Sequence, residues 1–103
     1  MEGVELICFQ IIASVGTARS MYIEAIHEAK EGRFETARQM IKDGGQVFLQ
    51  GHHAHMELLK NEASGNKPEI GILVIHAEDQ LMSAEGFSIL ATEFVDLYEK
   101  FSK

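Results

Sequence analysis

The hydrophobic pattern of the first part of the chain predicts two long helices. From about Val4 to Lys30, apolar residues recur at steps of three and four, which is the spacing of one face of an amphipathic helix. A similar pattern extends over residues 34–63. Gly32 lies in the short segment between them, at the position after a helix end that glycine favours. Because the connection is so short, we expect the two helices to form an antiparallel hairpin.

A third helix is predicted over residues 69–103. The preceding segment, residues 63–68, has the composition of a loop: Gly65 is suited to end the second helix, and Pro68 is suited to the first turn of the third. Residues 70–75 are rich in β-branched side chains, which also suit a buried strand. We favour a helix, because the three- and four-residue pattern continues to the end of the segment and a lone strand would have no partner.

The third predicted helix is apolar on nearly all sides. One of its stripes has the alternating three- and four-residue spacing of a coiled-coil seam. This seam comprises Leu73, His76, Gln80, Ser83, Phe87, Leu90, Phe94, Leu97 and Phe101. The opposite stripe carries Glu78, Glu85, Asp96 and Glu99. A helix that is apolar all round must be covered on more than one side, and the other two helices cannot cover it completely. We therefore expect copies of the chain to associate in a closed cyclic assembly through their seams.

Glycines interrupt both of the first two predicted helices. Gly16 lies in the first, either because a backbone or a ligand approaches closely there or because the helix tolerates it. Gly44, Gly45 and Gly51 lower the intrinsic stability of the second, so packing against its neighbours must hold it. Its inward face is predicted to comprise Ala37, Ile41, Gly44, Phe48, Gly51, His55 and Leu59.

The composition fits one globular domain, residues 1–103. Hydrophobic residues make up 46% of the chain, which argues against disorder, and the single proline argues against an all-β fold. The formal net charge of −7 argues against nucleic acid and anionic membrane surfaces as partners, because both are negatively charged. We therefore expect an all-α protein that binds neither nucleic acid nor a membrane.

The cysteine content and the N-terminal segment favour a cytoplasmic protein. Cys8 is the only cysteine, so no internal disulfide can form, which suits a reducing compartment. It lies among apolar residues and is interpreted as a small core residue. The chain opens without the positively charged region of a signal peptide. The longest apolar run, Leu6–Val15, is shorter than the ~20 residues that span a bilayer.

His76 and Asp79 occupy positions of the third helix where a soluble domain normally has apolar residues. In one interpretation, His76 is a hydrogen-bonded core histidine and Asp79 is an ordinary buried polar residue. In the other, His76 is a functional imidazole with a carboxylate nearby. The combination favours the second interpretation, because a carboxylate is costly to bury without a partner.

Three histidines in the second helix raise the possibility of a metal site. His52 and His55 have the i, i+3 spacing that helical metal ligands use. However, His53 points about 100° away from His52, and no cysteine or inward carboxylate completes a ligand set within the segment. We therefore favour core or interface packing for these residues over a dedicated metal site.

Five segments of the chain carry a family pattern. They are residues 16–20 (Gly-Thr-Ala-Arg-Ser), 29–34 (Ala-Lys-Glu-Gly-Arg-Phe), 52–59 (His-His-Ala-His-Met-Glu-Leu-Leu), 62–65 (Glu-Ala-Ser-Gly) and 76–82 (His-Ala-Glu-Asp-Gln-Leu-Met). Together they closely resemble the lactose/cellobiose family of enzyme IIA components of the bacterial phosphoenolpyruvate:sugar phosphotransferase system. The last segment is the most specific.

The resemblance implies a fold and an activity. The fold would be an up-down-up three-helix protomer that forms a homotrimer with nine helices. His76 would accept a phosphoryl group on Nε2 from phospho-HPr and pass it to the cysteine of an enzyme IIB, for uptake of a β-disaccharide of the lactose, cellobiose or chitobiose type. Asp79 from three subunits would share one divalent cation, Mg²⁺, per trimer. Histidine suits the carrier role, because its unperturbed pKa of about 6.5 leaves neutral imidazole abundant.

The chain departs from the family pattern at three positions near this motif. Glu78 and Gln80 stand where many relatives have glutamine and a second histidine, and His55 stands where glutamine is expected. Gln80 is one turn from His76, so it is a candidate to hydrogen-bond the ring or the phosphoryl group, although it cannot take a proton. Gly16 is a second candidate for the phosphoryl pocket.

Two other functions compete with the carrier. The Gly-x-Phe-x-x-Ala turn within residues 25–37 is faintly similar to a tetratricopeptide-type helix pair, which would make the chain a non-enzymatic helical adaptor. Such arrays need several repeats for stability, and only one candidate pair is present. A histidine-rich metal buffer using His52 and His55 is the other alternative.

Overall fold

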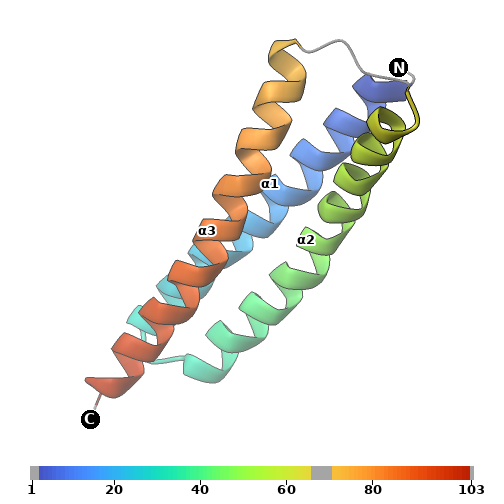
Figure 1. The fold of residues 1–103 in the computed structure, drawn as a ribbon. Helices are drawn as coiled ribbons and strands as arrows, with labels where there is room; N and C mark the ends of the chain where they lie inside the picture. The colour runs from blue at the N-terminus through green and yellow to red at the C-terminus, as the bar shows by residue number, and fades with distance from the viewer. Residues whose placement is uncertain (1–2, 66–70, 103) are drawn as a thin grey trace.

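A computed structural model describes residues 3–65 and 71–102, and these residues form three helices (Figure 1). Helix α1 is Gly3–Lys30, α2 is Phe34–Ala63 and α3 is Ile72–Lys100. They run up, down and up in one bundle that measures 57 × 19 × 16 Å. The predicted all-α fold and the topology of the protomer are confirmed. Residues 72–75 are helical, so the strand considered for this segment is wrong.

The turn between α1 and α2 has the geometry that its glycine predicts. Gly32 has φ +82°, a left-handed conformation that costs glycine nothing because it lacks a Cβ. The Gly32 amide donates to the Ala29 carbonyl, and the Arg33 amide donates to the Glu28 carbonyl, each at 3.0 Å. This pair of hydrogen bonds is the Schellman motif, which ends a helix and reverses the chain within a few residues.

Helix α3 is shorter than the sequence predicts. It begins at Ile72 rather than at residue 69, because Gly71 has extended backbone dihedrals (φ −125°, ψ −176°) and forms the N-cap. It ends at Lys100, with Phe101 as the C-cap. The predicted place of Pro68 in the first helical turn falls outside the described residues.

Helix α1 is the central element of the core, because it packs along both other helices. Its buried stripe consists of Cys8, Ile11, Val15, Ala18, Tyr22, Ala25 and Ala29. The buried stripe of α3 consists of Ala77, Leu81, Ala84, Ala91 and Val95. That of α2 has a strict seven-residue spacing: Ala37, Gly44, Gly51 and Leu58. The prediction that Leu59 faces inward is wrong. Leu58 continues the seven-residue stripe, and Leu59 is exposed.

By length and composition, α1 is also apolar enough to cross a membrane. In this fold the apolar residues of α1 pack inside the bundle: its seven buried residues form the shared core with α2 and α3.

Gly44 and Gly51 allow α1 and α2 to approach closely. A Cβ atom on Gly51 would lie 2.6 Å from Cγ1 of Val15, and one on Gly44 would lie 2.8 Å from Cε1 of Tyr22. Both distances are shorter than any ordinary contact, so a side chain at either position would push the helices apart. Gly16, for which close approach was one interpretation, is different: among the described residues, no neighbour lies within 4 Å of the place that a Cβ atom would take.

Polar contacts connect α2 and α3 at the end of the bundle where α2 begins and α3 ends. Arg38 of α2 donates to Asp96 Oδ1 at 2.9 Å and to Glu99 Oε1 at 2.5 Å. These hydrogen bonds and the two charges raise the pKa of the Arg38 guanidinium, with Glu99 contributing most. At this end of the bundle, the acidic stripe of α3 therefore binds the guanidinium of Arg38.

The close approach of α1 and α2 gives a first prediction. Gly51→Ala should lower the free energy of unfolding by about 1–3 kcal/mol, because the added methyl meets the fully buried Val15. Gly45→Ala is the matched control: nothing lies within 4 Å of its added methyl. It should stabilise the helix by up to about 1 kcal/mol. Thermal unfolding at one protein concentration checks both, and equal effects of the two substitutions would contradict the packing argument.

Candidate functional site

His76 is exposed on the second turn of α3. Its neighbour Ala77 is fully buried and packs against α1, so the histidine is directed away from the core of its own chain. The interpretation of His76 as a hydrogen-bonded core histidine is therefore wrong. An exposed imidazole on a rigid helix can be reached by another protein, which a transfer site requires.

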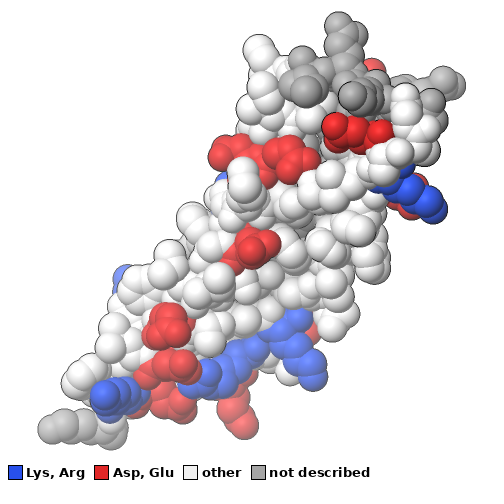
Figure 2. Space-filling model, viewed as in Figure 1, with Lys and Arg blue, Asp and Glu red and all other residues white. Residues whose placement is uncertain are grey.

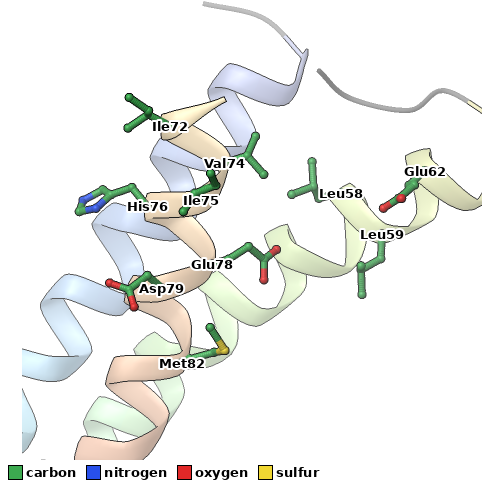
Figure 3. A pocket seen from close by; sticks show the side chains of 10 residues that line it. All are labelled: Leu58, Leu59, Glu62, Ile72, Val74, Ile75, His76, Glu78, Asp79 and Met82. Carbon is green, nitrogen blue, oxygen red and sulfur yellow. The ribbon is translucent and has the colours of Figure 1, made fainter. Parts of the chain in front are cut away.

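Asp79 lies one turn further along α3 and is also exposed. In Figure 3, the side chains of His76 and Asp79 project from the same side of the helix, the side turned away from α2. Gln80, one turn from His76, is half-buried. The structure thus places the imidazole and the carboxylate on one face, as the sequence pattern predicts, although neither is buried within a single chain.

The lower part of this face of α3 is apolar and uncovered. Seam residues Leu90, Phe94, Leu97 and Phe101 are 53%, 42%, 50% and 71% exposed, respectively. Burying a fully exposed side chain of this kind contributes about 1.5–3 kcal/mol, so covering the part that is still exposed would contribute roughly half of that for each residue. A long row of exposed large apolar residues on a monomer marks an interaction surface. The predicted two-sided apolar character of α3 is therefore observed, with one side covered by α1 and the seam uncovered.

A cavity of about 690 Å³ lies beside His76, between the end of α2 and the start of α3 (Figure 3). Its walls are mostly apolar, with three carboxylates among them. The lining residues are Leu58, Leu59, Glu62, Ile72, Val74, Ile75, His76, Glu78, Asp79 and Met82. Gly16 and Gln80 do not belong to this lining among the described residues, so their assignment to a phosphoryl pocket stays a prediction.

Glu78 is the second carboxylate next to His76, and it points the other way. In Figure 3 its side chain projects toward α2. There its Oε1 lies 2.7 Å from Nε2 of His55. The two side chains are 35% and 16% exposed, respectively, so the contact is half-buried. Two of the positions at which the chain departs from its family pattern are thus in contact with each other, which neither position indicates by itself.

Cys8 is buried in the core, beneath the start of α3. Burial raises the pKa of its thiol, and the negative charge of Glu78 raises it further. Both effects disfavour the reactive thiolate. The prediction that Cys8 is a core residue rather than a nucleophile agrees with this environment.

The family comparison identifies the fold. Residues 6–99 match the family model described as the lactose/cellobiose-specific IIA subunit of the PTS, the phosphotransferase system. The chain belongs to this IIA family. IIA subunits are phosphotransfer components, so the chain is a PTS IIA component of the lactose/cellobiose type.

Individual relatives of this IIA subunit agree over almost its whole length. It is 42% identical to the lichenan-specific phosphotransferase enzyme IIA component of Bacillus subtilis, over 99% of this chain and 93% of that protein. The cellobiose-specific enzyme IIA of Bacillus anthracis has a crystal structure with a TM-score of 0.92 and 40% identity, covering 97% and 93% of the two chains. An Escherichia coli IIA(chitobiose), solved in solution as a complex with HPr, has a TM-score of 0.83 and 28% identity over 97% of each chain.

The remaining histidines of this IIA subunit form no metal centre among the described residues, where no group of three potential ligands converges. His52 and His53 are exposed, with ring centroids 6.3 Å apart, and His55 turns inward to Glu78. The i, i+3 spacing of His52 and His55 therefore does not produce a paired site. A sequence signal for the His55 contact did exist, because both His55 and Glu78 are departures from the family pattern.

The exposed seam of the IIA subunit gives a second prediction. Leu90→Glu should shift the protein toward monomers at micromolar concentration, because burying a charge in an apolar contact is costly. Leu49→Glu is the matched control, since Leu49 is 44% exposed but lies on α2, away from the seam. Light scattering measures both masses. A monomeric wild type, or equal masses for all three proteins, would contradict association through the seam.

Proposed function

We propose that this IIA subunit is a phosphoryl carrier that acts through His76. The single observation that carries the proposal is the exposed imidazole of His76 on the second turn of α3, within the segment that matches the family model. The phosphoryl group would come from phospho-HPr and leave to the cysteine of an enzyme IIB. The complex of the E. coli relative with HPr supports the donor.

The start of α3 suits a negatively charged group on His76. Helical side chains lean toward the N-terminus of their helix, so the ring extends toward the first turn. The positive end of the helix dipole lies there. The first turn holds no acidic residue, and its N-cap is a glycine without a side chain, so no carboxylate of that turn competes for this end. This arrangement favours a phosphoryl group on the ring.

Transfer at His76 consists of two displacements at phosphorus. In the first, the lone pair of the neutral ring nitrogen, Nε2, forms a bond to phosphorus while the bond to the donor breaks. In the second, the thiolate of the enzyme IIB cysteine attacks phosphorus and the bond to Nε2 breaks, so the imidazole returns neutral. Such transfers depend on positioning and charge neutralisation rather than on extra covalent steps. In an assembly, apolar side chains of neighbouring copies around His76 would limit water and hence hydrolysis.

We further propose a homotrimer with nine helices and one Mg²⁺ shared by Asp79 of three subunits. Asp79 is exposed on the seam side of α3, where a cyclic assembly would bring its copies together. Oxygen ligands suit a hard cation such as Mg²⁺. One carboxylate per chain makes no site by itself, which agrees with the lack of a ligand cluster among the described residues. The ion would neutralise the three converging carboxylates.

The substrate class and the location follow from the same family. The relatives named above are lichenan- and cellobiose-specific, and the solution complex belongs to the N,N'-diacetylchitobiose branch. We propose that this carrier serves uptake of a β-linked disaccharide of this type, in the cytoplasm. Figure 2 shows acidic side chains spread along one face and the basic ones mostly toward the end where α2 begins. An acidic surface suits a partner with a basic docking face.

Phosphorylation tests the carrier directly. With phosphoenolpyruvate, enzyme I and HPr, the wild type should gain one acid-labile phosphate per chain, measured by mass spectrometry. His76→Gln should gain none, because the amide cannot act as the nucleophile. His53→Gln, which removes an exposed histidine elsewhere, should react like the wild type. A phosphorylated His76→Gln protein would reject the site.

Native mass spectrometry tests the shared cation. In the presence of Mg²⁺, the wild type should appear as a trimer with one ion, and Asp79→Asn should lose the ion and bind its copies less tightly. Glu85→Gln is the matched control, because Glu85 is an exposed carboxylate on the acidic side of α3. A metal-free wild-type trimer, or an Asp79→Asn trimer with unchanged ion content, would contradict the proposal.

A further inference from the structure

The contact between His55 and Glu78 is one of two polar bridges between α2 and α3 in the described part of the chain. The other, made by Arg38 with Asp96 and Glu99, lies at the opposite end of the bundle. Nε2 of His55 is 2.7 Å from Oε1 of Glu78. The His55 bridge is therefore the polar connection that fixes the start of α3, which carries His76, to α2.

The His55 bridge lies in a part of the chain where several negative charges gather. Glu62, Glu78 and Asp79 all line the cavity beside His76, so this end of the chain is rich in carboxylates. A phosphoryl group that enters here brings further negative charge. Two of these carboxylates lie within one turn of His76 on its own helix. Asp79, the proposed cation ligand, projects from the same side as His76, whereas Glu78 projects toward α2, away from the seam.

We propose that His55 is a positioning residue for phosphoryl transfer at His76. It holds the Glu78 carboxylate against α2 and reduces the repulsion that this carboxylate exerts on the incoming group. The inference rests on the proposed carrier function. His55 itself touches neither the phosphoryl group nor the ring of His76, so its effect is exerted through Glu78. The half-burial of both side chains supports the assignment, because a carboxylate that is partly removed from water is screened less than one on the surface.

The test is a set of variants that separates charge from structure. His55→Gln leaves the Glu78 carboxylate without its imidazole partner, and the rate of phosphorylation by phospho-HPr should fall roughly threefold to tenfold. The double variant His55→Gln/Glu78→Gln removes the charge as well and should recover most of the lost rate. His53→Gln controls for the loss of a histidine on the same helix. Melting temperatures and circular dichroism confirm that each variant is folded.

Salt provides a readout that a purely structural role would not change. The deficit of His55→Gln relative to the wild type should shrink as salt rises, because salt screens the unpaired carboxylate. If the bridge served only to tie α2 to α3, the double variant would be as slow as His55→Gln and the deficit would not depend on salt. Either result would overturn the proposal, as would a His55→Gln rate equal to the wild type.

The same assay distinguishes failure of this inference from failure of the carrier function. A wild type that accepts no phosphate at His76 rejects the carrier. A wild type that accepts phosphate, together with variants that do not follow the expected order, rejects only the role of His55.

Discussion

The structure depends on the fact that only one side of helix α3 is covered by the rest of the chain. Helix α3 has apolar residues on two sides, and the chain itself covers only one of them, through the packing of Ala77, Ala84 and Ala91 against α1. The three alanines on this buried side let the helices lie close together, while many of the large apolar side chains of α3 lie on the other side. The exposed seam is therefore a consequence of how the core is built. His76 and Asp79 lie on that uncovered side, which makes them available to other chains.

The contacts of α2 show two different ways of holding a helix. Toward α1 it packs through Gly44 and Gly51, where no side chain separates the two helices. Toward α3 it shares apolar core clusters and adds polar bridges near the two ends, those of Arg38 and His55. Close packing fixes the distance between α1 and α2, whereas the bridges fix how α3 is aligned along α2. A helix with interior glycines is weak by itself, so α2 takes its stability from these contacts.

Most of the fold and part of the site could be predicted from the sequence. The three-residue and four-residue periodicity indicated the helices, and Gly32 indicated the turn, because these are local effects. The start of α3 was placed too early, since Ile70 continues the apolar pattern before Ile72 and periodicity cannot detect the extended backbone of Gly71. The sequence also could not predict that His76 is exposed. The stripe that contains it has the same sequence pattern whether it packs against the same chain or against another one. The choice of Leu58 over Leu59 depended on which residue continues the buried stripe of α2, and a spacing of three or four residues allows either.

The pairing of His55 with Glu78 shows what single positions cannot reveal. Each residue, taken alone, is an unexplained departure from a family pattern, and an acidic residue beside a phosphoryl-accepting histidine even looks unfavourable. In the structure the two residues meet across α2 and α3, so the carboxylate has an imidazole that faces it. Asp79, the carboxylate on the same side as His76, forms none of the ion pairs found among the described residues. The two sides of the helix thus differ in their partners: Glu78 meets a side chain of its own chain, whereas a partner for Asp79 would come from outside it.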